Sequence, residues 1–246
     1  MAFASNYRRW IMDSLQPYIG RHIVEVGAGT GAFSKLLLAA GPASLTILEP
    51  SSNLYPLLAT LLSPVDSTGV VHIHQSNFPD AWNGSAKIPT PDTAVYINVL
   101  EHIEDDKTEL KTIFKALAPG GRILVFVPAL PFLMSSMDRG LGHFRRYTLP
   151  ELVVKCSSAG FDIKTARYFD LLGVAPWWIK YRLLKSNSME AGAVRAHDRW
   201  VVPVSRTIES FIKVPFGKNI ILIGEKEAVS STEPQPGSKT DSQPKP

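Results

Sequence analysis

Residues 23–31 read Ile23-Val24-Glu25-Val26-Gly27-Ala28-Gly29-Thr30-Gly31, a short apolar run that ends in a glycine-rich turn. Residues 33–40 are expected to form a helix, which Gly41-Pro42 ends. A strand, a glycine turn and a helix in this order are typical of nucleotide-binding folds, because the glycines let a ligand approach the backbone and the helix start offers free N–H groups. The stretch therefore predicts a cofactor-binding loop at the end of a strand.

Beyond this loop, strand-like and helix-like segments alternate through the first two-thirds of the chain. A helix is expected from residue 106 to 117, capped by Asp105 or Asp106, and another opens at Thr148 with Glu151 three residues on. Such alternation is typical of an α/β fold with parallel strands. Besides residues 23–26, the expected strands are residues 45–48, 70–74, 93–98, 123–127, 161–168 and 219–224.

Residues 169–216 lie before the last expected strand and form an insertion rich in aromatic side chains. Trp177, Trp178, Tyr181 and Trp200 are among them, and such side chains suit the wall of an apolar pocket. We predict a small helical lid over a substrate pocket, within one domain that spans residues 1–227. From residue 228 to 246 the composition changes to Ser, Pro, Thr, Gln, Lys and Gly, which predicts a disordered tail.

The composition limits the location and the partners. The chain has 246 residues and a single cysteine, Cys156, which rules out an internal disulfide framework and fits a reducing compartment. No run approaches the roughly 18 apolar residues of a membrane span, and residues 1–10 lack a signal-peptide core, so a cytoplasmic location is expected. The net charge of +4 is scattered, with no basic stripe interleaved with aromatic residues, and we expect no nucleic-acid partner.

The glycine loop alone does not identify the cofactor. Residues 27–32 satisfy the dinucleotide pattern G-x-G-x-x-G/A, and Glu49, 22 positions after Gly27, stands where an acid that binds a ribose is expected. These features fit a nicotinamide oxidoreductase as well as an enzyme that uses S-adenosylmethionine (SAM). Glu25 favours SAM, because a carboxylate just before the first glycine repels a pyrophosphate but can contact an amino-acid amine.

The sequence resembles the class I SAM-dependent methyltransferases over nearly its whole length, to about Glu225. Residues 24–31 are similar to their first motif, residues 98–103 (Asn-Val-Leu-Glu-His-Ile) to their fourth-strand motif, and residues 117–121 to the turn before their fifth strand. The resemblance implies a Rossmann-like, seven-stranded, mostly parallel sheet with helices on both faces, and SAM as the cofactor. The cofactor contacts it implies are Tyr7, Glu25, Gly27, Ala28, Gly29, Gly31, Glu49, Pro50, Asn98, Val99 and Leu100.

One position departs from the family pattern. The family commonly has an aspartate after the third strand that holds the adenine amino group, whereas this chain has Gln75-Ser76-Asn77-Phe78. Asn77 is expected to accept the adenine hydrogen bond through its side-chain carbonyl, and Phe78 to stack on the ring. The alternative is that Asn77 is only a turn residue.

Residues 138–148 follow the fifth expected strand and resemble a G-H-x-R-R-Y-T stretch in a little-characterised branch of the same family. Methyl transfer from a sulfonium is an in-line displacement, so the protein has to align the acceptor and can supply a base. His143 is predicted as this base, with His102 as a rival whose alternative role is packing. Arg145 and Arg146, with Tyr147 beside them, are predicted to hold an anionic substrate; alternatively the arginines pair with acids and pin the loop.

The sequence leaves several hypotheses about the function open. The leading one is methyl transfer to a small-molecule oxygen, nitrogen or carbon acceptor that is anionic or hydrophobic. Alternatives are a lipid-linked or macromolecular acceptor, a nicotinamide oxidoreductase, and a protein that binds SAM without catalysis. Peripheral membrane contact is considered because residues 177–185 mix aromatic and basic side chains. No cluster of His, Asp, Glu or Cys has metal-ligand spacing, so no metal is predicted. The sequence does not indicate the oligomeric state.

Overall fold

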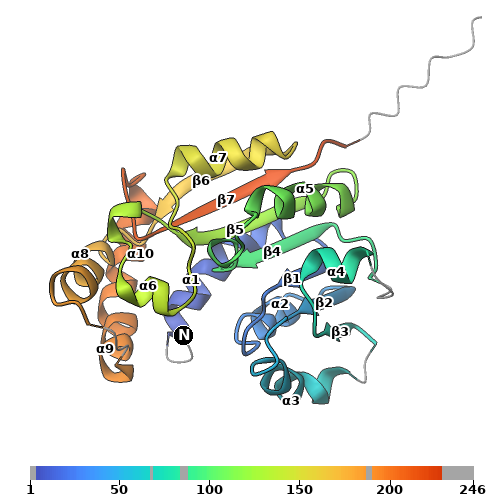
Figure 1. The fold of residues 1–246 in the computed structure, drawn as a ribbon, viewed down its shortest axis with the longest axis horizontal. Helices are drawn as coiled ribbons and strands as arrows, with labels where there is room; N and C mark the ends of the chain where they lie inside the picture. The colour runs from blue at the N-terminus through green and yellow to red at the C-terminus, as the bar shows by residue number, and fades with distance from the viewer. Residues whose placement is uncertain (1–3, 67–68, 84–87, 187–189, 229–246) are drawn as a thin grey trace, which may run out of the picture.

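The computed structural model describes residues 4–66, 69–83, 88–186 and 190–228. Its centre is a seven-stranded sheet with the order β3-β2-β1-β4-β5-β7-β6 (Figure 1). The first five strands, β1 to β5, are parallel to one another, and β7 runs antiparallel to both β5 and β6. This confirms the predicted mostly parallel α/β sheet. The strands are β1 (His22–Val26), β2 (Ser44–Leu48), β3 (Val71–His74), β4 (Thr93–Ile97), β5 (Arg122–Pro128), β6 (Asp162–Phe169) and β7 (Asn219–Glu225).

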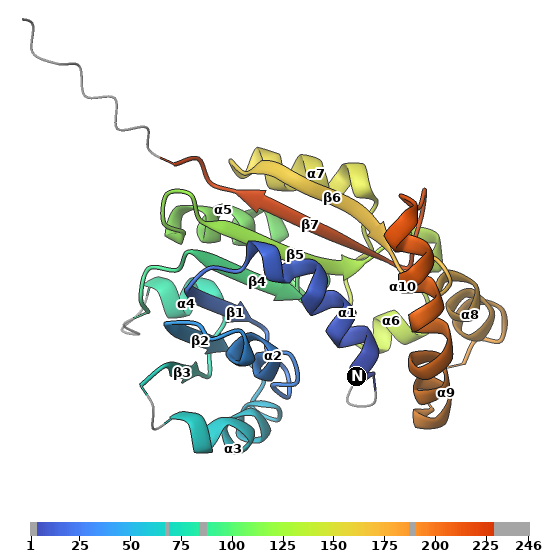
Figure 2. The same ribbon diagram turned by 180° about the vertical axis from the view of Figure 1, so that it is seen from behind.

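Helices cover both faces of the sheet, as predicted (Figures 1 and 2). One face carries α4, α5 and α7, and the other carries α1, α2 and α3, each over its own buried apolar cluster. The helices are α1 (Ser5–Leu15), α2 (Ser34–Ala39), α3 (Tyr55–Asp66), α4 (Phe78–Asn83), α5 (Asp106–Ala116), α6 (Ser136–Gly140), α7 (Leu149–Ser158), α8 (Val174–Trp177), α9 (Ala191–Ala196) and α10 (Val202–Phe211).

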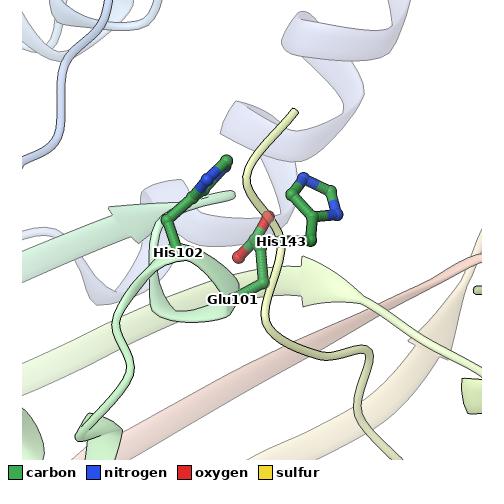
Figure 3. A group of neighbouring side chains, drawn as sticks. All are labelled: Glu101, His102 and His143. Carbon is green, nitrogen blue, oxygen red and sulfur yellow. The ribbon is translucent and has the colours of Figure 1, made fainter. Parts of the chain in front are cut away.

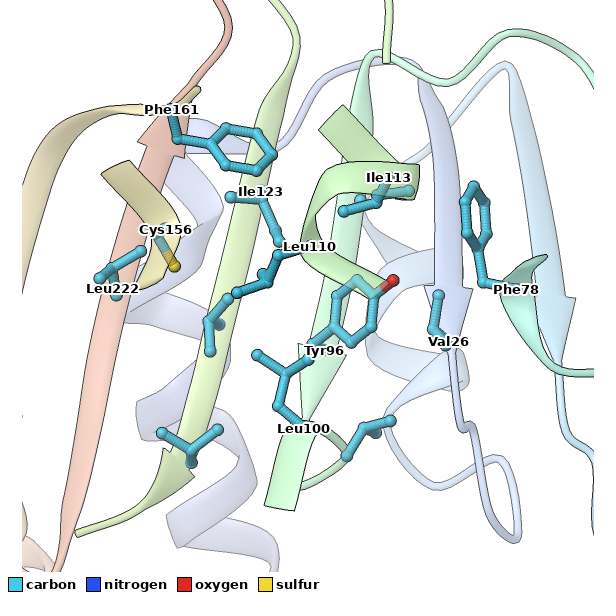
Figure 4. Packing of buried hydrophobic residues seen from close by; sticks show 14 of the residues in the cluster. Val26, Phe78, Tyr96, Leu100, Leu110, Ile113, Ile123, Cys156, Phe161 and Leu222 are labelled. Carbon is cyan, nitrogen blue, oxygen red and sulfur yellow. The ribbon is translucent and has the colours of Figure 1, made fainter. Parts of the chain in front are cut away.

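The two covered faces explain why the central strands are uninterrupted apolar runs. In β5, Ile123 and Val125 belong to the cluster under α5 and α7, while Leu124 and Phe126 belong to the cluster on the opposite face. Successive residues of a strand point to opposite faces, so every position of a strand covered on both sides must be apolar. Figure 4 shows part of the first cluster, where α5 packs on β4 and β5.

Two helices begin at the capping residues predicted from the sequence. The Asp105 side chain accepts a hydrogen bond from the Thr108 N–H at 3.1 Å and caps α5. The Thr148 hydroxyl accepts one from the Glu151 N–H at 3.3 Å and caps α7. The helices α1, α4 and α6 were not predicted. Two of them are only six and five residues long, so they carry little apolar periodicity.

The insertion lies beyond the carboxyl ends of β4 and β5, on the side where α1 begins (Figures 1 and 2). It consists of α8 to α10 and two π-helical turns, Trp178–Leu183 and His197–Val201. Asp198 ties it to α1 by accepting hydrogen bonds from the backbone N–H groups of Asn6 and Tyr7. Among the described residues no helix is long and apolar enough to cross a membrane. Nearly all of the predicted disordered tail, residues 229–246, lies outside the described residues.

Candidate functional site

The glycine loop after β1 has a backbone that other residues would not adopt easily. Gly27, Gly29 and Gly31 have φ values of +68°, +59° and +77°. A Cβ on Gly27 would lie 2.7 Å from Val99 Cγ2, whereas a Cβ on Gly29 would meet nothing within 4 Å. The loop is therefore packed against the end of β4 at Gly27 and opens into free space at Gly29, where a ligand can approach the backbone.

Glu49 follows β2 and fastens this loop to the neighbouring strand. Its side chain is buried, with Oε2 accepting a hydrogen bond of 2.6 Å from the Gly29 N–H and Oε1 accepting one of 2.9 Å from the Ser51 N–H. A carboxylate has about four acceptor positions. Both oxygens of Glu49 therefore keep acceptor capacity for ligand hydroxyls.

A pocket of about 800 Å³ opens at the carboxyl ends of β1, β2 and β4. This volume falls within the range of small-molecule and cofactor sites, and the position matches the crevice where ligands bind in open α/β sheets. The structure thus brings together residues that the sequence places far apart. The predicted cofactor residues that line the pocket are Gly27, Gly29, Glu49, Pro50, Asn77, Phe78, Asn98 and Val99.

Asn98 shapes one wall of this pocket. It has a left-handed φ of +53°, a conformation that Asn tolerates better than most residues. Its N–H donates to the Phe126 carbonyl at 2.7 Å, and the chain then turns into a single 3-10 turn, Leu100–His102. This turn puts His102 on the pocket wall. Leu100, predicted as a cofactor contact, points into the core instead (Figure 4).

Glu25 lies at the end of β1 with its side chain buried, and its Oε2 has no hydrogen-bond partner among the described residues. Burial raises the pKa of Glu25 to about 7; the nearby Ser34 side chain opposes the rise and the charge of Glu49 adds to it. An unpartnered buried carboxylate oxygen is costly unless a donor or cation completes it. Glu25 itself is not among the residues that line the pocket, and neither are Ala28 and Gly31 of the same loop.

Tyr7 does not lie at this pocket, and the structure corrects its predicted role. Its hydroxyl donates to Asn219 Oδ1 at 2.9 Å, and its ring is buried against Trp10 and Phe169. It also lines a second, smaller cavity between α1 and the insertion. Tyr7 therefore anchors α1 to the sheet and the insertion, a role for which residues 5–15 alone carry no signal.

Asn77 and Phe78 border the pocket, but their side chains are already engaged. Asn77 Oδ1 accepts the Asp80 N–H at 2.9 Å and its Nδ2 donates to Asp80 Oδ2 at 2.8 Å, so Asn77 caps α4. Phe78 is fully buried and stacks on Trp82 with ring centroids 6.0 Å apart. The expected adenine contacts of both side chains are thus replaced by the turn role for Asn77 and by core packing for Phe78 (Figure 4).

The segment predicted to be catalytic is organised around Asp138. Asp138 Oδ1 accepts hydrogen bonds from His143 Nδ1 at 3.1 Å and from Arg146 Nε at 2.8 Å, and Oδ2 accepts one from the Ser135 N–H at 2.9 Å. Burial opposes ionisation of Asp138, but these bonds and the Arg146 charge outweigh it and hold its pKa below the usual range. Asp138 is therefore a buried carboxylate that orients His143.

Arg145, Arg146 and Tyr147 were predicted to hold substrate, and the structure corrects this. Arg146 is buried, bound to Asp138 and to the Ala129 carbonyl. Arg145 pairs with Asp106 at 2.8 Å. The Tyr147 hydroxyl donates to the same carboxylate at 2.7 Å. All three side chains pin the segment, as the alternative interpretation of the arginines stated.

His102 and His143 come together at the pocket edge, 4.6 Å apart between ring centroids and nearly perpendicular. Burial, followed by the neighbouring His143, lowers the pKa of His102. Glu101 lies between the two rings, fully buried (Figure 3). One potential ligand atom from each of these three side chains lies within 4.8 Å of the other two. The spacing of residues along the chain does not indicate this group, because Glu101 and His143 are 42 positions apart.

Comparison with known proteins gives one family. The model of a methyltransferase domain matches residues 5–166. A ubiquinone biosynthesis O-methyltransferase of Pseudomonas fluorescens is 24% identical over 179 residues, 67% of this chain and 72% of that protein. A ribosomal RNA small subunit methyltransferase A of Maridesulfovibrio salexigens is 44% identical over 54 residues, so the chain matches only 21% of its length.

The fold has counterparts among solved structures. A Burkholderia thailandensis 1,6-didemethyltoxoflavin-N1-methyltransferase, solved with its substrate and S-adenosylhomocysteine, superposes with a TM-score of 0.57 at 16% identity. The superposition covers 92% of this chain and 80% of that one. At this identity the likeness concerns the fold.

Proposed function

Because the chain belongs to the methyltransferase-domain family and is a SAM-dependent methyltransferase, we propose that it methylates an oxygen atom of a small hydrophobic or anionic acceptor. The observation that carries the proposal is the pocket itself. One cavity of about 800 Å³ is lined by the glycine loop and Glu49 and also by His102. A cofactor and an acceptor can therefore lie side by side in it.

The residues present fit SAM. Gly29 leaves open space beside the backbone, and Glu49 keeps acceptor positions for the two ribose hydroxyls. The unpartnered Oε2 of Glu25 suits a cationic amine at the mouth of β1. The left-handed Asn98 turns the backbone of Val99 along the same wall. Bound SAM supplies an electrophilic methyl group on a sulfonium, and these residues hold and orient it.

His143 is the side chain best prepared to act on the acceptor. Because Asp138 accepts a hydrogen bond from Nδ1, the hydrogen-bond network assigns the proton to Nδ1 and leaves the lone pair on Nε2. Arg146 and Ser135 hold Asp138 in turn. The imidazole thus presents a fixed electron-pair donor near the pocket wall, next to His102.

The acceptor class is inferred from the insertion, which we treat as a lid. A second cavity, of about 190 Å³, lies between α1 and the insertion; its lining includes Trp177, Tyr181, Lys180 and Lys218. The Trp177 ring packs against Arg146, which connects this cavity to Asp138 and His143. Lys218 is paired with Asp170 at 2.7 Å and Lys180 with Glu190 at 3.7 Å, so the aromatic walls favour a hydrophobic acceptor. The O-methyltransferase relative, which aligns with 67% of this chain, favours oxygen as the acceptor atom.

A lipid-linked acceptor is the second candidate, favoured by one observation. The insertion exposes Trp178, Ile179, Leu183, Leu184 and Trp200, the last to 68%, beside basic residues such as Arg182 and Arg199. Aromatic and aliphatic side chains next to cations suit an anionic membrane surface. Co-sedimentation with vesicles containing phosphatidylglycerol tests it: binding that a Trp178→Ser, Trp200→Ser double variant loses supports this candidate, and its absence rejects it. The cytoplasmic location and the lack of a nucleic-acid partner stay predictions.

Calorimetric titration tests the cofactor, with SAM and NAD in separate runs. We expect saturable binding of SAM and none of NAD. Incubation of the protein with SAM and a panel of phenolic, carboxylic and amine acceptors, read by mass spectrometry, then tests the acceptor atom. Methylation restricted to nitrogen acceptors would overturn the oxygen proposal while leaving the cofactor assignment intact.

A further inference from the structure

Glu101 is a buried carboxylate without a partner. Its exposed fraction is 0%, and neither Oε1 nor Oε2 has a hydrogen-bond partner among the described residues. An unsatisfied buried carboxyl group costs about 1–3 kcal/mol or more in either protonation state. Such a group next to a pocket points to a missing cation.

We propose that Glu101, His102 and His143 bind a divalent metal ion at the edge of the cofactor pocket. One ligand atom from each residue lies within 4.8 Å of the other two. Around a metal with bonds of about 2.0–2.2 Å, neighbouring ligand atoms lie roughly 3–4 Å apart. Small side-chain rotations are therefore enough to close the site. Figure 3 shows the Glu101 carboxylate between the two imidazoles, which come from separate parts of the chain.

The residues around the proposed ligands are of the kind found around the ligands of known metal sites. A histidine ligand usually donates its other ring N–H to a carboxylate or a backbone carbonyl, which fixes the ring and its tautomer. His143 has Asp138 at 3.1 Å on Nδ1, so Nε2 is the atom left to coordinate. His102 has the backbone of Gly142 beside it, which raises the pKa of the ring against the effect of burial. Asp138 is itself held by Ser135 and Arg146, so the outer groups are already in place.

The donor set indicates the class of metal. Two imidazoles and one carboxylate suit zinc, iron(II), cobalt(II) or manganese(II) better than calcium, which prefers oxygen ligands. Three protein ligands leave coordination positions open. His102 lines the cofactor pocket, so the ion would lie on its wall.

This position gives the metal a role, which rests on the proposed function. With Nε2 bound to the metal, His143 would no longer serve as the base; an acceptor hydroxyl bound at an open coordination position would become more acidic and would lose its proton to water at neutral pH. The resulting oxygen anion forms a bond to the methyl carbon while the carbon–sulfur bond breaks, and the bonding electron pair stays on sulfur as a thioether. The metal keeps its oxidation state throughout. The acceptor would then be a compound with a hydroxyl group, and a second adjacent oxygen would bind better.

The test uses the full chain, stripped of metal with a chelator and titrated with cobalt(II). We expect one equivalent of cobalt to bind, with visible absorption bands typical of nitrogen and oxygen ligation. Glu101→Gln, which keeps the side-chain shape, and His143→Ala should each weaken binding by more than about 100-fold. The control His72→Ala removes a histidine of β3 and should bind cobalt like the parent protein.

SAM titration of the same samples separates the two proposals. If every variant binds SAM normally but the parent protein binds no cobalt, the metal site is rejected and the cofactor site stands. Cobalt binding of equal strength in the parent and in Glu101→Gln and His143→Ala also rejects the site. If SAM does not bind while cobalt binds and depends on these residues, the metal site stands and the proposed function fails.

Discussion

Glu49 accepts a hydrogen bond of 2.6 Å from the Gly29 N–H, and this bond joins the end of β2 to the glycine loop after β1. The acid expected to bind a ribose therefore also holds the loop that approaches the cofactor. One substitution should disturb both.

Glu49→Gln should weaken SAM binding by about 10- to 100-fold, because hydrogen bonds to a charged acceptor are worth about 1.5–3 kcal/mol and the amide replaces one acceptor oxygen with a donor. Calorimetry measures the dissociation constant. Glu151→Gln in α7 is the matched control and should bind SAM like the parent. An unchanged affinity of Glu49→Gln would remove Glu49 from the cofactor site.

Gly27→Ala should abolish detectable SAM binding. The new Cβ would lie 2.7 Å from Val99 Cγ2 at a residue with φ of +68°, so the loop and the end of β4 must separate. Gly41→Ala is the control: Gly41 has φ of +74° with nothing within 4 Å of a Cβ, so it bears backbone strain alone. We expect Gly41→Ala to lower the thermal midpoint slightly and keep SAM affinity. Equal SAM affinity in the two variants would contradict the loop assignment.

SAM affinity should depend on pH through Glu25. Burial raises the pKa of this carboxyl to about 7, and a cationic amine beside it would favour the ionised form. Below that pH, binding must first remove a proton, so affinity should fall as the pH drops from 8 to 6, approaching tenfold per pH unit at the acid end. Calorimetry at pH 6, 7 and 8 measures this slope. Glu25→Gln should flatten it; a parent protein with no slope would show that Glu25 does not face the amine.

The sequence was sufficient for the features that depend on neighbouring residues. The apolar run of β5 and the caps Asp105 and Thr148 follow from period and residue type, which the local chain contains. The glycine loop and Glu49 were found because their spacing reflects a single β-α-β unit.

The features that could not be predicted from the sequence depend on contacts between segments that lie far apart in the chain. Arg145 and Arg146 suggested an anionic substrate, but the anions they meet are Asp106 and Asp138 of the protein itself. The meeting of Glu101 with His143 likewise results from the segment after β5 folding back on the turn after β4, where the Phe144 N–H donates to the Glu101 carbonyl at 2.8 Å. The residue type indicates which groups a side chain can bind. The fold determines which of those groups lies close enough to be its partner.

Asp106 should be the most important charge for the stability of this folded-back segment. Its buried carboxylate pairs with Arg145 at 2.8 Å and Lys155 at 2.6 Å, and it accepts the Tyr147 hydroxyl. Burial opposes ionisation, but bonds from Lys155, Tyr147 and Arg145 outweigh it, so the pKa of Asp106 is lowered. Its stabilisation is therefore present above the ordinary aspartate pKa and is lost as the pH falls through the lower folded value.

Asp106→Asn would leave two cations facing one another without a counter-charge, and should lower the free energy of unfolding by about 2–3 kcal/mol at pH 7. Urea denaturation followed by tryptophan fluorescence measures the loss. The difference from the parent should shrink below about pH 4, where Asp106 of the unfolded parent begins to take up a proton, and should vanish below the lower pKa of the folded state. Asp162→Asn, which breaks an exposed pair with Lys164, is the control and should leave the midpoint unchanged. If the two variants were equally stable, the segment would be held by packing, and its three polar side chains would again be available for a substrate.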